Sequence, residues 1–204
     1  MKYIDFNNAF KDRPLVDVRE VRQVFPDFES RRFYEWQKKG YIKKLSKLFY
    51  VFSNRNINEV ENNFIANKLL EPSYISLESA LRHYNLIPEI VFLTTSVTTR
   101  RTKLLKSPIG DFQYRKVKEK LFFGYRIINA GQIAYKIADP EKALLDFLYL
   151  RSDIKNKNDI FELRINKEVY REVIDQNKLR RYLEAFSSRV LNKKIDKLTE
   201  ILNQ

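Results

Sequence analysis

Residues 28–52 constrain the fold more than any other part of the chain, because they read as a short helix followed directly by two short strands. Phe33 and Trp36 are three residues apart, as on the buried face of a helix. The runs 41–45 and 48–52 are rich in aromatic and β-branched side chains, which is typical of strands. A tight connection, or a slightly wider loop, would join these two runs into a hairpin.

Two further helices are predicted before this segment, over residues 3–10 and 18–25. Asp17 is a helix-capping residue, Pro26 ends the second helix and Gly40 ends the third. The predicted buried stripe of the second helix consists of Val18, Val21, Val24 and Phe25. The order helix, turn, helix, hairpin is that of a winged helix-turn-helix, whose second motif helix enters the DNA major groove.

The charge of this segment points in the same direction. Between Arg31 and Arg55 there are eight basic residues and one acidic residue, Glu35. The formal net charge of +13 also favours an anionic partner, of which nucleic acid and an acidic membrane surface are the usual examples. A basic helix beside a basic hairpin also occurs as a plain solvated surface, and that alternative stays open.

The helix face opposite the buried aromatic residues is expected to contact DNA bases. Its members are Arg31, Tyr34, Glu35 and Lys38, and Ser30 and Arg32 are assigned to the same DNA-binding surface. The hairpin is expected to contact phosphates. It contributes Lys43, Lys44 and Lys47. Specificity is therefore expected from the helix and affinity from the hairpin.

A polar linker around residues 53–58 predicts a domain boundary, with a winged helix-turn-helix domain over 1–56 and a second domain over 57–204. In the second domain, strands are predicted over 91–99, 112–117, 121–128 and 133–137. Helices are predicted over 59–70, 77–84 and 142–150, with Ser76 and Asp139 as caps, and from Asn166 onward with an apolar stripe that includes Phe186 and Val190. The predicted fold class is α+β with a mixed second domain and a helical C-terminus.

A second basic cluster lies between Arg100 and Lys120. Arg100, Arg101 and Lys103 are candidates for a second DNA or partner surface. The alternation of charged and apolar residues around Arg115 is equally consistent with the solvent-facing side of a sheet. The role of this cluster stays open.

An enzyme is not predicted. The chain has one histidine, His83, no cysteine and no glycine-rich phosphate-binding motif, which excludes multi-histidine metal sites and thiolate chemistry within the chain. The nearest approach to a nuclease cluster is Asp139, Glu141, Lys142 and Asp146, and helix capping explains these residues. No catalytic residue, metal or cofactor is assigned. The chain contains no apolar run long enough to span a membrane and no signal-peptide pattern, so a cytoplasmic protein without membrane contact is expected.

Several short sequence motifs of the chain resemble those of a known family. They are YISLESALRHYNLIPE (Tyr74 to Glu89), TTSVTTRRTK, GDFQYRKV, FFGYRI and IADPEKALLDFLYL (Ile137 to Leu150). In this order and spacing they look like the AbiEi family of antitoxins. The N-terminal segment PLVDVREVRQVF…FYEWQKKGYIKKLSKLFYVF is similar to the winged-helix domain of the same family.

The resemblance implies a type IV toxin-antitoxin system of the abortive-infection kind, a form of phage defence. The antitoxin would repress its own operon by binding inverted repeats in promoter DNA, and its second domain would counteract a nucleotidyltransferase-like toxin. The family generally neutralises its toxin without a stable complex. An antitoxin that acts mainly by binding the toxin directly, with DNA binding secondary, is the alternative.

Overall fold

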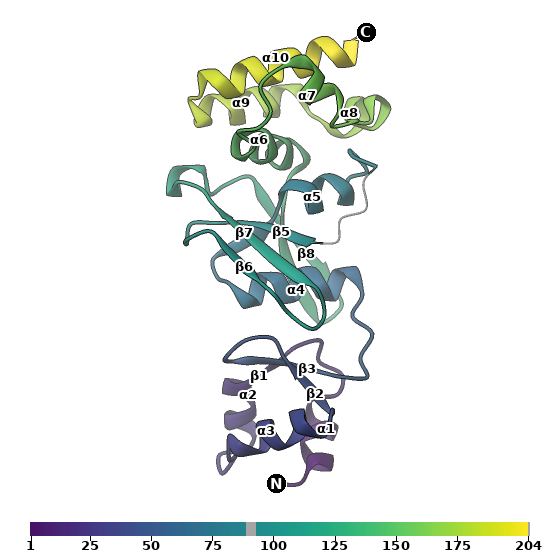
Figure 1. The fold of residues 1–204 in the computed structure, drawn as a ribbon, viewed down its shortest axis with the longest axis vertical. Helices are drawn as coiled ribbons and strands as arrows, with labels where there is room; N and C mark the ends of the chain where they lie inside the picture. The colour runs from purple at the N-terminus through teal and green to yellow at the C-terminus, as the bar shows by residue number, and fades with distance from the viewer. Residues whose placement is uncertain (89–92, 204) are drawn as a thin grey trace.

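The computed structural model describes residues 1–88 and 93–203, and its elements belong to the α+β class predicted from the sequence. Figure 1 shows an elongated molecule with the N-terminus at one end and the C-terminal helices at the other. The elements of the first unit are α1 (Tyr3–Phe10), β1 (Val16–Asp17), α2 (Val18–Val24), α3 (Arg31–Lys38), β2 (Ile42–Lys44) and β3 (Phe49–Phe52). The strands pair antiparallel in the order β1-β3-β2. A pair of helices followed by a hairpin is the predicted arrangement.

Aromatic side chains form the core of the first unit. The ring of Phe6 in α1 lies 4.5 Å from that of Trp36 in α3, measured between centroids. Phe33 stacks on Tyr50 of β3 at 4.4 Å and an interplanar angle of 6°. Aromatic pairs of this kind contribute about 0.5–1.5 kcal/mol each beyond their buried area. The core therefore holds α3 firmly against the sheet.

The start of α2 and the C-terminal end of α3 form as the sequence predicts. Asp17 precedes α2, and its Oδ1 accepts a hydrogen bond of 2.8 Å from the N–H of Arg19. Gly40 follows α3 with φ of +73°, and the N–H of Tyr41 then donates to the carbonyl of Trp36 at 2.9 Å. This left-handed glycine ending closes the helix and turns the chain into β2.

Two details of this unit differ from the prediction. The helix that we expected from residue 28 begins at Arg31, because the N–H of Phe28 closes a turn onto the carbonyl of Phe25 at 3.0 Å. Val24 is 52% exposed instead of buried. It is the last residue of α2, which packs on the core through Val18 and Val21, while Phe25 just after the helix packs against the same core.

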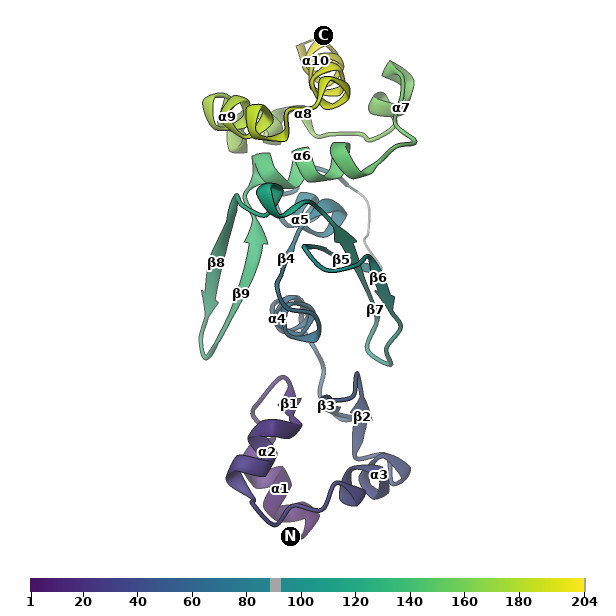
Figure 2. The same ribbon diagram turned by 90° about the vertical axis from the view of Figure 1, so that its left-hand side faces the viewer.

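The second unit is built on a six-stranded mixed sheet in the order β6-β7-β5-β4-β9-β8. Its strands are β4 (Ser73–Ile75), β5 (Leu93–Thr98), β6 (Lys103–Leu105), β7 (Asp111–Lys116), β8 (Tyr125–Ala130) and β9 (Ile133–Ala138). Its helices are α4 (Glu59–Leu69), α5 (Leu77–His83), α6 (Pro140–Leu150), α7 (Lys157–Phe161), α8 (Lys167–Val173), α9 (Gln176–Phe186) and α10 (Arg189–Asn203), with a short 3-10 helix η1 (Glu119–Leu121). In Figure 2, α4 lies on the side of the sheet nearer the first unit, and α5 and α6 lie on the other side.

The strand that we predicted over 121–128 is confirmed only from Tyr125, where β8 begins. Residues 119–121 form η1, Gly124 adopts φ of +71°, and β8 begins only at Tyr125. Residues 91 and 92 of the strand predicted over 91–99 lie outside the described residues, and β5 covers 93–98. The short strands β4 and β6 were not predicted.

The C-terminal end of α6 is capped by side chains from distant elements. The buried Lys194 of α10 donates from Nζ to the carbonyls of Leu148 (2.7 Å) and Arg151 (2.6 Å). Arg115 of β7 donates to the carbonyl of Leu150 at 2.9 Å, so its side chain is half-buried and not on the solvent-facing side of the sheet. Carbonyls at a helix end have no partner within the helix, so these cations satisfy α6 and attach it to its neighbours.

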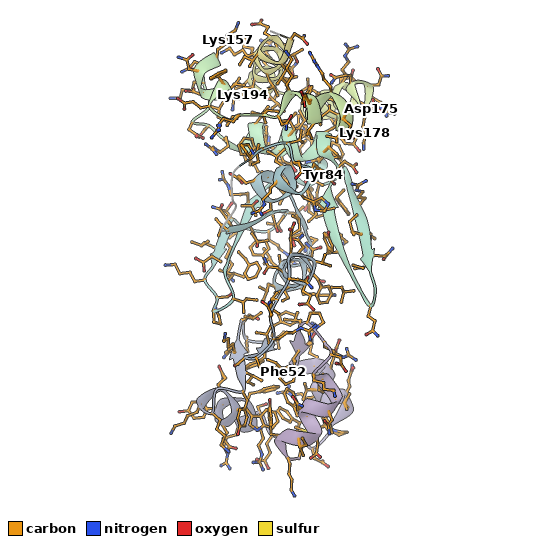
Figure 3. All side chains as sticks on the ribbon, turned by 90° about the vertical axis from the view of Figure 1, so that its right-hand side faces the viewer. Phe52, Tyr84, Lys157, Asp175, Lys178 and Lys194 are labelled. Carbon is orange, nitrogen blue, oxygen red and sulfur yellow. The ribbon has the colours of Figure 1, made fainter. Side chains whose placement is uncertain are left out.

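The acids at the start of α6 attach it to α9. Asp139 occupies the cap position, but its side chain makes no capping hydrogen bond. Its carboxylate accepts a hydrogen bond from Tyr182 at 3.0 Å and pairs with Lys178 at 3.0 Å. Glu141, 2% exposed, accepts from the N–H of Asp175 at 2.9 Å. Figure 3 shows Asp175 and Lys178 close together at the start of α9. The predicted N-cap position of Asp139 is therefore confirmed, but its carboxylate contacts α9 instead of the backbone of α6.

A fully buried polar cluster joins α6 to β4. Lys142 and Asp146 form an ion pair with no exposed side-chain surface. The other carboxylate oxygen accepts hydrogen bonds from Tyr74 (2.8 Å) and Ser76 (2.9 Å), and the Lys142 ammonium lies 2.9 Å from the Tyr74 hydroxyl. Ser76 is the N-cap residue of α5, as predicted, but its side chain makes no capping bond to that helix. Its hydroxyl satisfies the buried carboxylate instead.

Apolar side chains of the first unit also pack on the second. Tyr50 and Phe52 of β3 belong to the smaller hydrophobic cluster of the first unit. Phe49 and Val51, on the other face of the same strand, belong to the larger cluster together with Leu15, Leu45 and the core of the second unit. Strand β3 is thus buried on both faces, and the sheet of the first unit lies between its own helices and the second unit.

Arg55 adds a polar connection at the same junction. Its guanidinium donates to the carbonyl of Lys11 at 3.0 Å and forms an ion pair with Glu61 of α4. Glu61 itself completes a capping box with Asn58, whose Oδ1 accepts from the N–H of Glu61 at 2.9 Å. The boundary at residues 56 and 57 stays a prediction, and these contacts lie directly beside it.

Gly124 is the glycine whose backbone is packed most closely against other side chains, and this packing gives a stability prediction. A Cβ at this position would lie 2.9 Å from Cε2 of Tyr182 and 3.1 Å from Cγ of Lys142. Gly131 has a similar φ of +63°, but a Cβ there would meet nothing within 4 Å, so this position isolates the backbone cost. We expect Gly124→Ala to lower the free energy of unfolding by about 1–2 kcal/mol more than Gly131→Ala. Urea unfolding of the two variants measures the difference, and equal losses would contradict the packing described here.

Candidate nucleic-acid interface

The two faces of α3 differ sharply in exposure. Phe33 and Trp36 are 3% and 4% exposed and face the core. Tyr34 is 67% exposed, the Arg31 side chain is 76% exposed, and Lys38 is also at the surface. Figures 1 and 2 show α3 at the end of the molecule remote from the second unit. The described part of the chain therefore leaves this face open to a large partner.

Glu35 is less available than its neighbours. It is half-buried, and its two carboxylate oxygens pair with Arg31 at 3.2 Å and with Arg32 at 3.4 Å. A carboxylate held by two guanidinium groups orients both of them. A nearby phosphate would compete with Glu35 for these guanidinium groups. The four residues expected to contact bases thus differ in exposure. Arg31, Tyr34 and Lys38 are exposed, whereas Glu35 is half-buried and paired.

One basic residue beside the start of α3 was not assigned from the sequence, namely Arg22 of α2. Ser30 precedes the helix, makes no capping bond, and accepts a hydrogen bond of 3.0 Å from Nη2 of Arg22. Arg22 lies in the last turn of α2 and is exposed. A cation at the end of the first motif helix beside the start of the second extends the basic surface. Its position in the last turn of the predicted helix was the available signal.

The three lysines of the hairpin lie at different distances from α3. Lys43 and Lys44 are exposed on β2, paired in register with Val51 and Tyr50 of β3. Lys47 is exposed in the connection that follows, which lies at the end of the hairpin farther from α3 (Figure 2). The residues flanking that connection pack on the second unit. Lys43 and Lys44 therefore lie nearer α3 than Lys47 does.

The second basic cluster is separate from α3. Arg100, Arg101 and Lys103 are exposed in and beside the connection from β5 to β6. Figure 1 shows β5, β6 and β7 in the second unit and α3 near the opposite end of the first unit. The structure thus does not bring these three residues together with those of α3.

Among the described residues, the histidine and the buried ion pair lie apart from the basic surface of α3. No group of three or more His, Asp or Glu side chains among them is arranged to hold a metal ion. Nδ1 of His83 lies 3.8 Å from a carboxylate oxygen of Glu59 at the surface. Burial raises the pKa of Asp146 and lowers the pKa of Lys142, and each is fully enclosed. Across residues 1–88 and 93–203, no helix is both long and apolar enough to span a membrane.

Comparison with known proteins adds no family: no family model matches the chain, and no curated protein matches its sequence.

Proposed function

We propose that the chain is a sequence-specific DNA-binding repressor that also acts as an antitoxin, as the AbiEi resemblance of its sequence implies. The observation that carries the proposal is the open face of α3, where Arg31, Tyr34 and Lys38 project from a helix whose opposite face is buried. An α-helix of this kind fits the major groove, where Arg and Lys address guanine edges. The protein would act in the cytoplasm.

The electrostatics of the first unit support DNA as the partner. Arg22, Arg31, Lys38, Lys43 and Lys44 are exposed around α3 and β2. Neutralising phosphates releases counterions, so binding by such a surface weakens steeply as salt rises. Polar contacts to the backbone position the helix, and base contacts then select the site.

The second unit supports the antitoxin part of the proposal, because the motifs that resemble the AbiEi family lie in its helices and strands. The motifs of the resemblance fall on β4 and α5, on β5, on β7, on the start of β8 and on the segment from β9 to α6. Their residues are largely packing residues, including the enclosed pair Lys142 and Asp146. We therefore propose that this unit acts on the nucleotidyltransferase-like toxin by means other than catalysis.

A two-part experiment in cells tests the proposal. A reporter gene placed behind the DNA upstream of this gene should be repressed when the protein is expressed, and repression should require the open face of α3. Expression should also restore growth to cells that carry the neighbouring toxin gene. Absence of both effects would remove the proposed function.

Direct binding of the toxin is a second candidate, and one surface favours it. A groove of about 460 Å³ between α7, α8 and α10 has an apolar floor that includes Ile165 and Ile201. Phe161 on its edge is 70% exposed. Exposed apolar surface of this kind marks protein interaction sites. Elution of the two proteins as one species in size exclusion would support direct binding, and independent elution would remove it.

A further inference from the structure

A pocket of about 370 Å³ lies in the second unit where η1, the end of α6 and the turn from α9 to α10 meet. This volume is within the range of small-ligand sites. The pocket is remote from α3, and the proposed DNA-binding function does not use it. Its walls differ in character, and that difference indicates a class of ligand.

The charged part of the pocket lining is cationic. Lys118, Lys120 and Arg189 belong to it, and no acid is among the described residues that line the pocket. Among the described residues, no carboxylate lies within ion-pair distance of these three side chains, although Glu119 is exposed between the two lysines. Three cations that line one pocket without a counter-charge repel one another, and a bound anion relieves this repulsion.

Hydroxyl groups lie beside the cations. Ser187 and Ser188 both line the pocket. The Oγ of Ser188 accepts a hydrogen bond of 3.3 Å from the N–H of Leu191, which leaves its hydroxyl proton free to donate. The positive end of the helix dipole at the start of α10 also attracts anions, as the three cations do. The Ser187 hydroxyl already donates to the carbonyl of Glu184 at 3.0 Å, so the polar lining offers the three cations and the Ser188 hydroxyl as donors to phosphate oxygens.

The rest of the lining is largely apolar and aromatic. It includes Tyr149 and Phe186, whose rings lie 5.1 Å apart, measured between centroids, at 68°. Val190, also in the lining, is 66% exposed although the sequence pattern placed it in the buried stripe. An apolar side chain left open beside a cationic wall lacks a covering group within the described chain. A flat apolar ring system would cover it.

We propose that this pocket binds a nucleotide, with the phosphate held by Lys118, Lys120 and Arg189 and the base against the aromatic side. The inference goes beyond the proposed function and does not depend on it. A backbone phosphate of nucleic acid has the same charge chemistry as a nucleotide phosphate, so the test separates the two sources.

The test uses the full-length protein and titration calorimetry with 5′-AMP, 5′-GMP and ATP, and with adenosine as the uncharged comparison. We expect at least one nucleotide to bind and adenosine to bind at least about tenfold more weakly, because charged hydrogen bonds are lost. The variant Lys118→Gln/Lys120→Gln/Arg189→Gln should lose at least about tenfold in affinity. The control Arg180→Gln/Arg181→Gln/Lys193→Gln removes the same charge from exposed positions outside the pocket and should bind like the wild type.

Three outcomes would overturn the proposal. They are no binding of any nucleotide at millimolar concentration, equal binding by the pocket variant and the control, or equal binding of adenosine and AMP. A gel shift with the upstream DNA completes the test. The pocket variant should bind this DNA like the control variant, whereas a selective loss of DNA binding would assign the three cations to a DNA backbone and not to a nucleotide.

Discussion

The double substitution Arg31→Ala/Lys38→Ala is expected to weaken binding to the DNA upstream of this gene by about 10²- to 10³-fold. Each residue that addresses a base edge is worth about 1–3 kcal/mol, and every tenfold step in affinity corresponds to 1.4 kcal/mol. Both side chains are exposed and neither contributes to the core. The fold should therefore survive the change. Gel shift or fluorescence anisotropy at fixed salt measures the loss.

Arg180→Ala/Arg181→Ala is the matched control. These two arginines are exposed on α9, so the variant loses the same net charge at the far end of the molecule. We expect it to bind the upstream DNA within about threefold of the wild type, because the lost charges lie beyond the screening distance of the α3 surface. An equal loss in both double variants would show that net charge, and not the α3 face, drives binding.

Asp146→Ala is expected to lower the free energy of unfolding by about 3–5 kcal/mol, because it leaves the Lys142 ammonium without its counter-charge in a site with no exposed surface. The hydroxyls of Tyr74 and Ser76 lose their acceptor at the same time. Chemical unfolding followed by circular dichroism measures the loss. For a chain of this size the melting temperature should fall by roughly 10 °C.

Two further variants separate the buried ion pair from a general effect of losing a carboxylate. Glu200→Ala removes the partner of Lys157 in an exposed pair near the C-terminal end, and we expect less than about 1 kcal/mol of destabilisation. Lys142→Met/Asp146→Leu replaces both buried charges with apolar groups and should recover part of the stability lost in Asp146→Ala. An Asp146→Ala variant as stable as Glu200→Ala would contradict the enclosed ion pair.

The sequence predicts the first unit well because local signals determine it. Spacing places Phe33 and Trp36 on one face of α3, and Gly40 ends that helix by adopting a left-handed conformation. Asp17 caps α2 through its own nearby backbone. The exposure of Arg31 and Tyr34 follows directly from the same helical period. Residues close in sequence carry each of these signals.

Features that depend on contacts distant in sequence could not be predicted. Lys142 and Asp146 have the spacing of an ordinary surface pair on a helix, and only the packing of β4 against α6 encloses them. Val190 continues the apolar stripe of α9 in sequence, yet Ser187 adopts φ of +49° and redirects the chain between α9 and α10. The nucleotide pocket combines residues from three separate segments, so no local pattern signals it.

The geometry of the candidate interface was predicted in part for the same reason. Helical period identified the open face of α3, but it could not indicate that Glu35 pairs with two arginines or that Arg22 reaches Ser30 from the preceding helix. The sequence also could not indicate that the hairpin connection containing Lys47 lies toward the second unit. These details depend on side-chain rotamers and on packing between the units.

Salt dependence of binding to the upstream DNA is the most direct test of the central claim that the α3 face is a DNA-binding surface. For the wild type, the logarithm of the affinity should fall steeply and linearly with the logarithm of salt concentration, with tighter binding to the upstream DNA than to a scrambled duplex. Removal of Arg31 and Lys38 should make the slope shallower by about 1 to 2 and abolish the preference. Wild-type binding that is insensitive to salt, or equal for the two duplexes, would contradict the account.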